Sequence, residues 1–285
     1  MRVLITGAGG QLGVDLVRTC TEAGDEVIAC DHARLDLADR DSVYQAVTGT
    51  APDAVIHAGA WTAVDACEAD PDRAFLTNAM GSGWVADASR RVDAHLVAVS
   101  TDYVFDGTKA EPYQEWDATN PQSVYGRSKL AGEQAVFDHC PGAAIVRTAW
   151  VCGAQGSNMV KTVLGLRERP ELAFVDDQRG SPSFTADLAP MIRRLAAERR
   201  TGVHHVTNQG DTTWFGFVRD ILELAGSDPA KVRPISTAQL DPPRPAPRPA
   251  NSVLDNAALR LGGLPLLPHY RESLARLLHD LGARS

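Results

Sequence analysis

A tyrosine and a lysine, Tyr125 and Lys129, stand four residues apart in the sequence. On a helix this separation puts both side chains on one face. Reduction of a carbonyl group by hydride needs a proton donor at the oxygen that becomes an alkoxide. A tyrosine with an ordinary pKa of about 10 is a weak acid at neutral pH, and an adjacent ammonium group eases its ionisation. The pair is therefore a candidate general acid with its helper, although two unrelated residues on a solvated helix face would have the same spacing.

A second donor follows the apolar run at residues 95–100, which predicts a buried strand. In open α/β sheets, ligands bind beyond the carboxyl ends of the strands. Ser100 or Thr101, at the end of this run, could donate a hydrogen bond to the substrate oxygen and hold it against Tyr125. Hydroxyl residues also form turns at strand ends without any ligand. The order of the hydroxyl group and the Tyr-xxx-Lys pair along the chain favours the catalytic interpretation.

Gly7, Gly10 and Gly13 are spaced three residues apart, between an apolar run at residues 3–6 and a helical pattern at residues 13–23. Glycines there allow a tight turn, a close approach of the backbone to a pyrophosphate, and close packing of helix on strand. The start of the helix offers free N–H groups and a positive dipole end to the phosphates. The strand–turn–helix context predicts a dinucleotide-binding turn, and its three-by-three spacing points to the short-chain dehydrogenase group.

Asp31 ends the second predicted strand, 18 residues after Gly13, where an acid can accept a hydrogen bond from an adenosine ribose hydroxyl. A carboxylate there repels the 2′-phosphate of NADP and favours NAD. His32 and Arg34 follow directly and could weaken that preference. The residues therefore predict NADPH or NADH without deciding between them.

Two further segments follow strands and could contact the same cofactor. Asp36 and Leu37 could bind the adenine and pack on it, or Asp36 could cap the helix expected near residue 41. Residues 58–62 follow the third strand and include Ala60, Trp61 and Thr62. The small residues in this segment let a cofactor pass close over the edge of the sheet.

Short apolar runs alternate with helical patterns over the first half of the chain. Such alternation predicts βαβ units and a Rossmann-type, doubly wound parallel sheet. The expected strands are residues 3–6, 26–30, 54–58, 95–100 and 143–148, and the expected helices are residues 13–23, 41–47, 72–91 and 123–139. We expect a dinucleotide-binding domain over residues 1–150, to which residues 185–210 return. The remainder of 151–285 is mainly a smaller substrate-binding lobe, and the five prolines of residues 241–250 predict an extended loop laid over a site.

Composition excludes several classes of protein. The chain has 285 residues and a net charge of −8, which argues against binding to nucleic acids or anionic membranes. No run approaches the ~18 apolar residues of a membrane span, and the start of the chain has no signal-peptide pattern. The five cysteines are odd in number and form no CxxC pair, which argues against a disulfide framework or a zinc site. We expect a cytoplasmic protein.

The motif blocks of the chain resemble the dTDP-4-dehydrorhamnose reductase family of the extended short-chain dehydrogenase/reductases. The blocks are Gly-x-x-Gly-Gln-Leu-Gly at 7–13, Ala-Trp-Thr-Ala-Val-Asp at 60–65, Ser-Thr-Asp-Tyr-Val-Phe-Asp-Gly at 100–107, Tyr-Gly-x-x-Lys at 125–129, Arg-Thr-x-Trp-Val at 147–151, Asp-Asp-Gln-x-Gly-Ser-Pro at 176–182 and Arg-Pro-x-Asn-Ser at 248–252. They cover nearly the whole chain in the family's order. The Tyr-xxx-Lys pair is shared by the whole superfamily, whereas the blocks at 100–107 and 248–252 are far more specific.

The resemblance implies NAD(P)H-dependent reduction of the 4-keto group of a dTDP-4-dehydro-6-deoxyhexose, first of all dTDP-4-dehydro-L-rhamnose to dTDP-L-rhamnose. A 4-ketoreductase of a secondary-metabolite or streptose-type pathway is the alternative. By motif, Thr101, Tyr125 and Lys129 would be catalytic, Asp102 and Trp150 would contact the sugar nucleotide, and Arg248 would meet its diphosphate. The implied cofactor contacts are Gly7, Gly10, Gln11, Leu12, Gly13, Asp31, Asp36, Leu37, Ala60, Trp61 and Thr62, together with Tyr125 and Lys129.

Some positions depart from the family pattern. Trp61 and Cys152 stand where such reductases more often carry Tyr or His, and Tyr, so the exact sugar stays open. Certain relatives hold magnesium at an acidic dimer contact. Asp15 and Asp187 match parts of such a site, but Arg271 stands where a third acid would be needed. Magnesium therefore stays an open alternative, and we do not predict a metal site.

Three rival functions differ in what they need. A nucleotide-sugar 4,6-dehydratase needs an Asp-Glu pair after the threonine, and here Tyr103 follows Asp102. An epimerase would leave NAD(P)H unconsumed. Relatives also resemble a regulatory subunit of methionine adenosyltransferase, but the catalytic residues are intact here. A homodimer is expected only as the commonest default.

Overall fold

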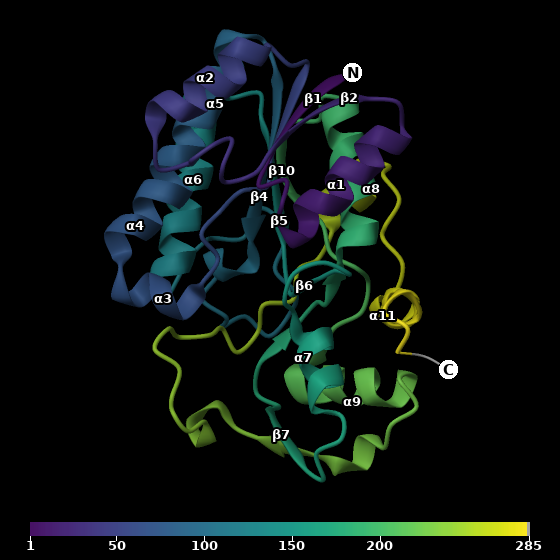
Figure 1. The fold of residues 1–285 in the computed structure, drawn as a ribbon. Coiled ribbons are helices and arrows are strands. Elements are labelled where there is room, and N and C mark those ends of the chain that lie inside the picture. The colour runs from purple at the N-terminus through teal and green to yellow at the C-terminus, as the bar shows by residue number, and fades with distance from the viewer. Residues whose placement is uncertain (284–285) are drawn as a thin grey trace.

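A parallel sheet of six strands forms the centre of the larger part of the molecule (Figure 1). The structure, a computed structural model, describes residues 1–283. In order across the sheet, the strands are β10 (Gly202–His205), β5 (Ala144–Thr148), β4 (His95–Thr101), β3 (Ala54–His57), β1 (Arg2–Thr6) and β2 (Glu26–Cys30). Every neighbouring pair is parallel. All six carboxyl ends therefore lie at one edge of the sheet.

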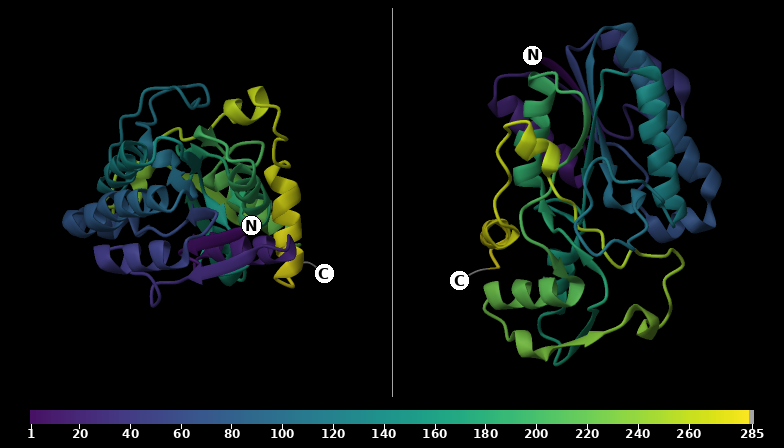
Figure 2. Two further views of the ribbon diagram at one scale, coloured as in Figure 1. Left: turned by 90° about the horizontal axis from the view of Figure 1, so that it is seen from above. Right: turned by 180° about the vertical axis from the view of Figure 1, so that it is seen from behind.

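Helices cover both faces of this sheet (Figures 1 and 2). One face carries α2 (Arg40–Thr50), α5 (Gly81–Arg91) and α6 (Val124–His139), and the other carries α1 (Gln11–Glu22) and α8 (Thr185–Ala197). In β1, the buried side chains of Val3 and Ile5 pack on the α1 and α8 side, whereas Leu4 packs on the opposite side. A strand covered on both faces needs apolar side chains in both directions, which is why it appears in the sequence as a continuous apolar run. The predicted Rossmann-type fold is confirmed.

The order of the strands reverses between β1 and β3, because the chain moves outward to β2 first and then returns to β3. Such a reversal leaves a crevice outside the carboxyl ends of the two strands, since their following segments leave in opposite directions. The glycine turn follows β1 and the Ala60–Thr62 segment follows β3. The topology therefore places both segments at the crevice.

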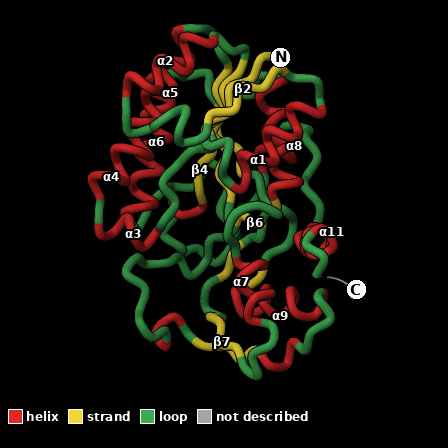
Figure 3. Tube along the Cα trace, viewed as in Figure 1, coloured by secondary structure: helices red, strands yellow, loops and turns green. Residues whose placement is uncertain are grey.

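A smaller lobe lies beyond the carboxyl edge of the sheet (Figure 3). Its elements are α7 (Met159–Leu166), α9 (Trp214–Leu224), α11 (Tyr270–Asp280) and three strand pairs: β7 (Leu172–Val175) with β12 (Val232–Ile235), β6 (Val151–Cys152) with β9 (Ser183–Phe184), and β8 (Arg179–Gly180) with β11 (Thr212–Thr213). Phe217 and Ile221 of α9 are fully buried in its core, beside Val160 of α7 and Leu274 of α11. Between these segments the chain returns to the large sheet for α8 and β10, and α10 (Ala257–Leu261) packs near β10.

The helical segment between β3 and β4 differs from the single helix expected over residues 72–91. It consists of α4 (Pro71–Phe75), a π-helical turn (Leu76–Met80) and α5, and a short helix α3 (Val64–Ala69) precedes it. A helix as short as α3 leaves too little periodicity to be predicted. Single π-helical turns within helices occur frequently at functional sites. Short 3₁₀ turns lie at Asp102–Val104, Pro229–Lys231 and Thr237–Gln239.

Among the helices of residues 1–283, none combines the length and the apolar character that a membrane span requires.

The proline-rich segment at residues 241–250, here named the strap, contains no helix or strand. It runs from the lobe back to the larger part of the molecule, where the backbone N–H of Ala246 donates to Asp65 at 3.1 Å. Gly107 lies directly against it, because a Cβ atom there would stand 2.5 Å from Pro249. The strap is thus anchored beside the 3₁₀ turn that follows β4.

A buried ion pair joins the strands to the helix that carries the Tyr-xxx-Lys pair. Arg147 of β5 donates to Glu133 of α6 at 2.7 Å, with only 6% and 5% of the two side chains exposed. Ser100 of β4 donates to the same carboxylate. Glu133 therefore holds the carboxyl end of β4 and one face of α6 at a set distance.

We expect loss of this carboxylate to destabilise the fold strongly. Glu133→Leu leaves the Arg147 guanidinium buried without a counter-ion, so the free energy of unfolding should fall by about 3–5 kcal/mol in urea denaturation. The double change Glu133→Leu with Arg147→Met removes both charges and should recover much of that loss. A single variant as stable as the wild type would contradict the assignment.

Candidate active site

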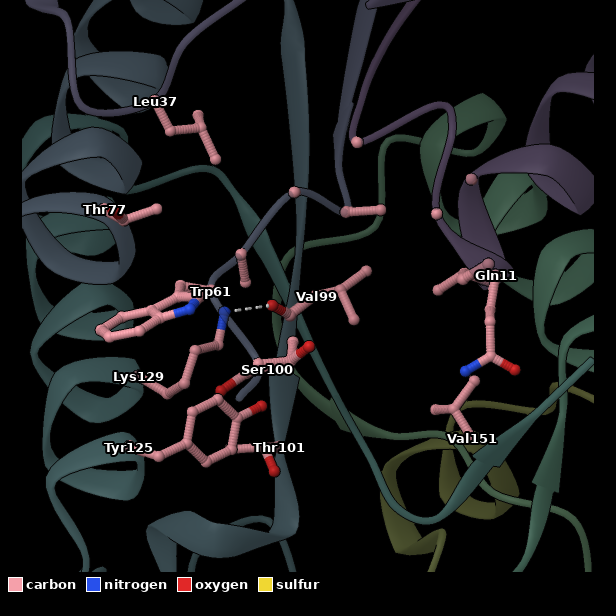
Figure 4. Close-up of a pocket in the computed structure, with 18 of the residues that line it drawn as sticks. Gln11, Leu37, Trp61, Thr77, Val99, Ser100, Thr101, Tyr125, Lys129 and Val151 are labelled. Atoms are coloured by element: carbon pink, nitrogen blue, oxygen red, sulfur yellow. Dashed lines mark hydrogen bonds between the residues drawn. The ribbon is translucent and has the colours of Figure 1, made fainter. Parts of the chain in front are cut away.

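A cavity of about 1090 Å³ opens at the carboxyl edge of the sheet, facing the lobe. Every residue that the sequence predicts for the cofactor and for catalysis lines it, and so do Asp102 and Trp150. Of the predicted site residues only Arg248 does not. Figure 4 shows Tyr125 and Lys129 entering the cavity from α6, Ser100 and Thr101 entering from β4, and Gln11 on the opposite wall.

The glycine turn brings helix α1 against strand β1 without any side chain between them. Gly7 has a φ of +67°, which L side chains rarely adopt. A Cβ atom on Gly13 would lie 2.0 Å from the carbonyl oxygen of Gly7. The N-cap of α1 is Gly10, which has no side chain to satisfy the first N–H groups. The turn therefore leaves these N–H groups and the positive end of the helix dipole available to a phosphate, and its shape fits a dinucleotide.

The residues around the predicted adenosine site have defined partners. Asp31 Oδ1 accepts hydrogen bonds from the backbone N–H groups of Ala33 and Arg34, each at 3.1 Å. The Arg34 guanidinium donates to the carbonyl oxygen of Ala29 at 3.3 Å. The N-cap of α2 is Asp39, not Asp36. Asp36 is therefore not a cap of this helix, and its side chain lies in the wall of the cavity.

Asn78, in the π-helical turn, fastens the segment that carries Trp61. Its Oδ1 accepts from the backbone N–H of Trp61 at 2.8 Å. Its Nδ2 donates to the backbone carbonyl oxygen of Trp61 at 3.1 Å and to the Ser128 hydroxyl at 3.0 Å. Sequence reasoning did not single out this residue. An asparagine inside a predicted helix was the available signal, because its amide competes with helical hydrogen bonds.

Tyr125 and Lys129 have pKa values displaced in opposite directions by the same cause. Burial raises the pKa of Tyr125 well above its usual range, and the neighbouring Thr101 hydroxyl opposes the rise. Burial lowers the pKa of Lys129 to about 8, against the opposing charge of Glu133. The Lys129 ammonium donates to the Val99 carbonyl oxygen at 2.9 Å, as Figure 4 shows. At neutral pH the tyrosine therefore carries its proton and the lysine most of its charge.

Thr101 and Asp102 form a buried pair at the end of β4. The Thr101 hydroxyl lies 3.0 Å from Asp102 Oδ1 and accepts from the Tyr103 N–H at 3.2 Å. Burial raises the pKa of Asp102 to about 6, although the neighbouring Ser252 and Thr101 hydroxyl groups oppose the rise. An unperturbed aspartate titrates near pH 4, so Asp102 titrates much closer to neutrality.

Two tryptophans stack where the chain passes from β5 into the lobe, and both pack against the lobe core. Trp150 follows β5, and its ring lies parallel to that of Trp214, the first residue of α9, with centroids 3.5 Å apart. Trp150 has a φ of +45°, a strained value for a bulky residue. Both rings line the cavity. Trp214 was missed by sequence reasoning, since its place beside Trp150 depends on contacts distant along the chain.

Arg248 lies on the strap and is paired within the protein. Its guanidinium donates to both carboxylate oxygens of Asp65, at 2.7 Å for Nη2 and Oδ2. These bonds hold the pKa of Asp65 below its usual range. A diphosphate at this position would compete with Asp65 for the guanidinium.

The residues considered for magnesium do not fit a metal site. Asp15 pairs with Arg18 at 2.7 Å, and Asp187 is bound by Arg276, Asn208 and Ser273. Arg271 pairs with Asp220 and Glu223. In the described part of the chain, no three His, Cys, Asp or Glu side chains gather where a metal ion could bind.

Comparison with known proteins finds one family over the whole length. The sequence model of the RmlD substrate binding domain matches residues 1–283. A dTDP-4-dehydrorhamnose reductase of Streptomyces griseus is 41% identical, over 100% of this chain and 95% of the relative. The crystal structure of such a reductase from Clostridium acetobutylicum superposes with a TM-score of 0.95 at 41% identity, covering 99% of this chain and 100% of that one. One from Bacillus anthracis in complex with NADP gives 0.94 at 40%, covering 98% and 99%.

We expect Gly13→Ala to impair cofactor binding, because its methyl group would overlap the Gly7 carbonyl oxygen and push α1 away from the turn. The affinity for NADPH should fall at least about tenfold in a fluorescence titration, which corresponds to about 1.4 kcal/mol. Gly49→Ala is the control, since nothing lies within 4 Å of its Cβ atom and Gly49 does not line the cavity. Equal affinities in the two variants would refute the close approach.

Proposed function

The chain belongs to the family of the RmlD substrate binding domain, and from this premise we propose that it reduces the 4-keto group of a dTDP-4-dehydro-6-deoxyhexose with NAD(P)H. The substrate proposed first is dTDP-4-dehydro-L-rhamnose, with dTDP-L-rhamnose as product. The observation that carries the proposal is that the glycine turn, Thr101, Tyr125 and Lys129 line one cavity.

The reaction follows from the positions of these residues. Bound reduced nicotinamide supplies the hydride for C4 of the sugar. Tyr125 donates its phenolic proton to the ketone oxygen, since the buried phenol is protonated at neutral pH. Lys129 eases the loss of that proton and restores it through a ribose hydroxyl or water; the bond to Val99 uses one of its N–H groups and leaves two. Thr101 holds the ketone oxygen against Tyr125.

The cofactor would be held by the segments that follow the first three strands. The first N–H groups of α1, at Gln11, Leu12 and Gly13, would bind the pyrophosphate. Asp31 would bind the adenosine ribose, with Asp36 and Leu37 beside the adenine. The segment from Ala60 to Thr62, fastened by Asn78, would pass beneath the dinucleotide. The relative from Bacillus anthracis was solved with NADP, whereas Asp31 favours NADH, so we propose that both are used.

The substrate would bind between the sheet and the lobe formed mainly by residues 151–285. Asp102 and Trp150 line this side of the cavity and would contact the sugar nucleotide. Arg248 would exchange the Asp65 carboxylate for the diphosphate, which its planar guanidinium suits equally well. The strap would then close over the substrate.

Location and assembly are part of the proposal. All five cysteines are free and buried, as is usual in a reducing compartment, which supports the cytoplasm. The net charge of −8 supports a small-molecule partner rather than nucleic acid or an anionic membrane. A homodimer stays a default prediction.

The test offers dTDP-4-keto-6-deoxyhexoses of both C5 configurations with NADH and NADPH in parallel. Loss of reduced-nicotinamide absorbance, followed by determination of the C4 configuration, should identify a 4-ketoreductase and its sugar. Turnover of the sugar without loss of absorbance would indicate an epimerase instead. Cofactor binding with no turnover of any keto sugar would refute the proposed enzyme and favour a regulatory protein.

Tyr125→Phe removes the proton donor and little else. General acid catalysis contributes roughly 10²–10⁴ in rate, so kcat should fall by that factor. The dissociation constant of NADPH should stay nearly unchanged, because the ring remains in place. Unchanged turnover in the variant would exclude Tyr125 as the acid.

Arg248→Met tests the exchange of Asp65 for a diphosphate. The KM for the dTDP-sugar should rise at least about tenfold, the effect of losing one charge-assisted hydrogen bond of about 1.4 kcal/mol, while the affinity for NADPH stays constant. Arg244→Met is the control, because Arg244 is mostly exposed and lies 3.7 Å from the same Asp65. A KM that both changes leave at the wild-type value would rule out the contact.

A further inference from the structure

The Thr101 hydroxyl has one proton and two lone pairs with which to form hydrogen bonds. One lone pair accepts from the Tyr103 N–H at 3.2 Å, and Asp102 Oδ1 lies 3.0 Å away. An ionised carboxylate can only accept, so against an ionised Asp102 the Thr101 proton must point toward Asp102. The hydroxyl group then has only a lone pair left for the cavity. In this state Thr101 cannot donate to a ketone oxygen.

Protonation of Asp102 reverses this hydrogen bond. The carboxylic acid donates to Thr101 and occupies its second lone pair, so that the Thr101 proton is free to point toward Tyr125 and the substrate. All hydrogen-bonding groups of the Thr101 hydroxyl are then used. The Thr101 hydroxyl and the Tyr125 phenol are the two donors at the ketone oxygen. Donors aimed at the oxygen that gains negative charge stabilise the transition state.

The surroundings of Asp102 suit a neutral acid better than a charge. The residue is 2% exposed, and its Oδ2 has no hydrogen-bond partner among the described residues, although the side chain lines the cavity. A carboxylate with an unpartnered buried oxygen is poorly solvated. The protonated, neutral form avoids this cost.

Other titratable groups approach the pair from four elements: Tyr103 from the same 3₁₀ turn, Tyr125 and Lys129 from α6, Asp65 and Cys67 from α3, and Arg248 from the strap. Arg248 pairs with Asp65, and in the proposed substrate complex its charge would turn to the diphosphate. Lys129 donates to Val99. No cation among the described residues therefore forms an ion pair with Asp102 that would keep it ionised.

We infer that Asp102 is a positioning residue whose protonation turns the Thr101 hydroxyl toward the substrate ketone. The inference rests on the proposed reductase function and deepens it. Asp102 acts through Thr101, so the enzyme is more active with the carboxyl group protonated. Its effect therefore appears in the pH dependence of the rate.

The first experiment measures kcat/KM of the wild-type enzyme against pH. With a pKa of about 6, the protonated fraction falls roughly 25-fold between about pH 5.5 and about pH 7.5, and kcat/KM should fall with it. The 2′-phosphate of NADPH titrates near the same pH, as phosphate monoesters do. The decline must therefore also appear with NADH, which lacks this phosphate.

Two variants separate the positioning role from a structural one. Asp102→Asn carries an N–H that can donate to Thr101 at every pH, so its kcat/KM should lose the decline with pH, whatever its absolute value. Thr101→Val has nearly the same shape but no hydroxyl group. It should be slower by roughly 10²–10³, the effect of losing one oxyanion donor, and its rate should not change over this pH range.

The outcomes are distinct from those that test the proposed function. A wild-type enzyme that reduces the keto sugar with a flat profile over this range would overturn the inference and leave the function intact. A decline that persists in Asp102→Asn or in Thr101→Val would overturn it as well. Asp102→Ser, whose short hydroxyl cannot span the distance to Thr101, should be slow at every pH; a wild-type rate would also count against the inference.

Discussion

The close approach of helix α1 to strand β1 is the constraint on which the rest of the site depends. A Cβ atom at Gly13 would collide with the Gly7 carbonyl oxygen, so only a glycine lets the helix begin directly at the end of the strand. The uncapped N–H groups of α1 then face the crevice between β1 and β3. A dinucleotide bound there would extend along the carboxyl edge toward β4 and α6, where Thr101 and Tyr125 lie.

Burial at the end of the cavity where Tyr125 lies sets the protonation states of the acidic and basic side chains there. The same burial raises the pKa of Tyr125, lowers that of Lys129 and raises that of Asp102. In each case the uncharged form is favoured, as expected where few dipoles replace the lost water. For a reduction this direction is useful, because the product alcohol needs a proton that a protonated phenol can give. The negative charge of Glu133, which is paired with Arg147, opposes the fall in the pKa of Lys129. Glu133 does not itself line the cavity.

Features set by local backbone rules could be predicted from the sequence, and features set by distant contacts could not. The glycine turn and the four-residue spacing of Tyr125 and Lys129 depend on neighbouring residues, and the structure brings both to one cavity. Arg248 was assigned from its motif alone, which carries no sign of the Asp65 carboxylate that binds it. Asn78 binds the backbone of Trp61, and Trp214 stacks on Trp150. In each pair the two residues are distant in the sequence, so the contact exists only in the folded chain.

The stack of Trp150 on Trp214 gives the molecule an optical reporter of its own. Two indole rings that lie parallel at 3.5 Å share their electronic excitations, so they absorb circularly polarised light differently from separate rings. Both rings pack against the core of the lobe, and both border the cavity. A ligand that enters the cavity therefore meets a wall that the stacked rings help to form. Near-ultraviolet circular dichroism could follow binding in the cleft in the unmodified protein, without a label.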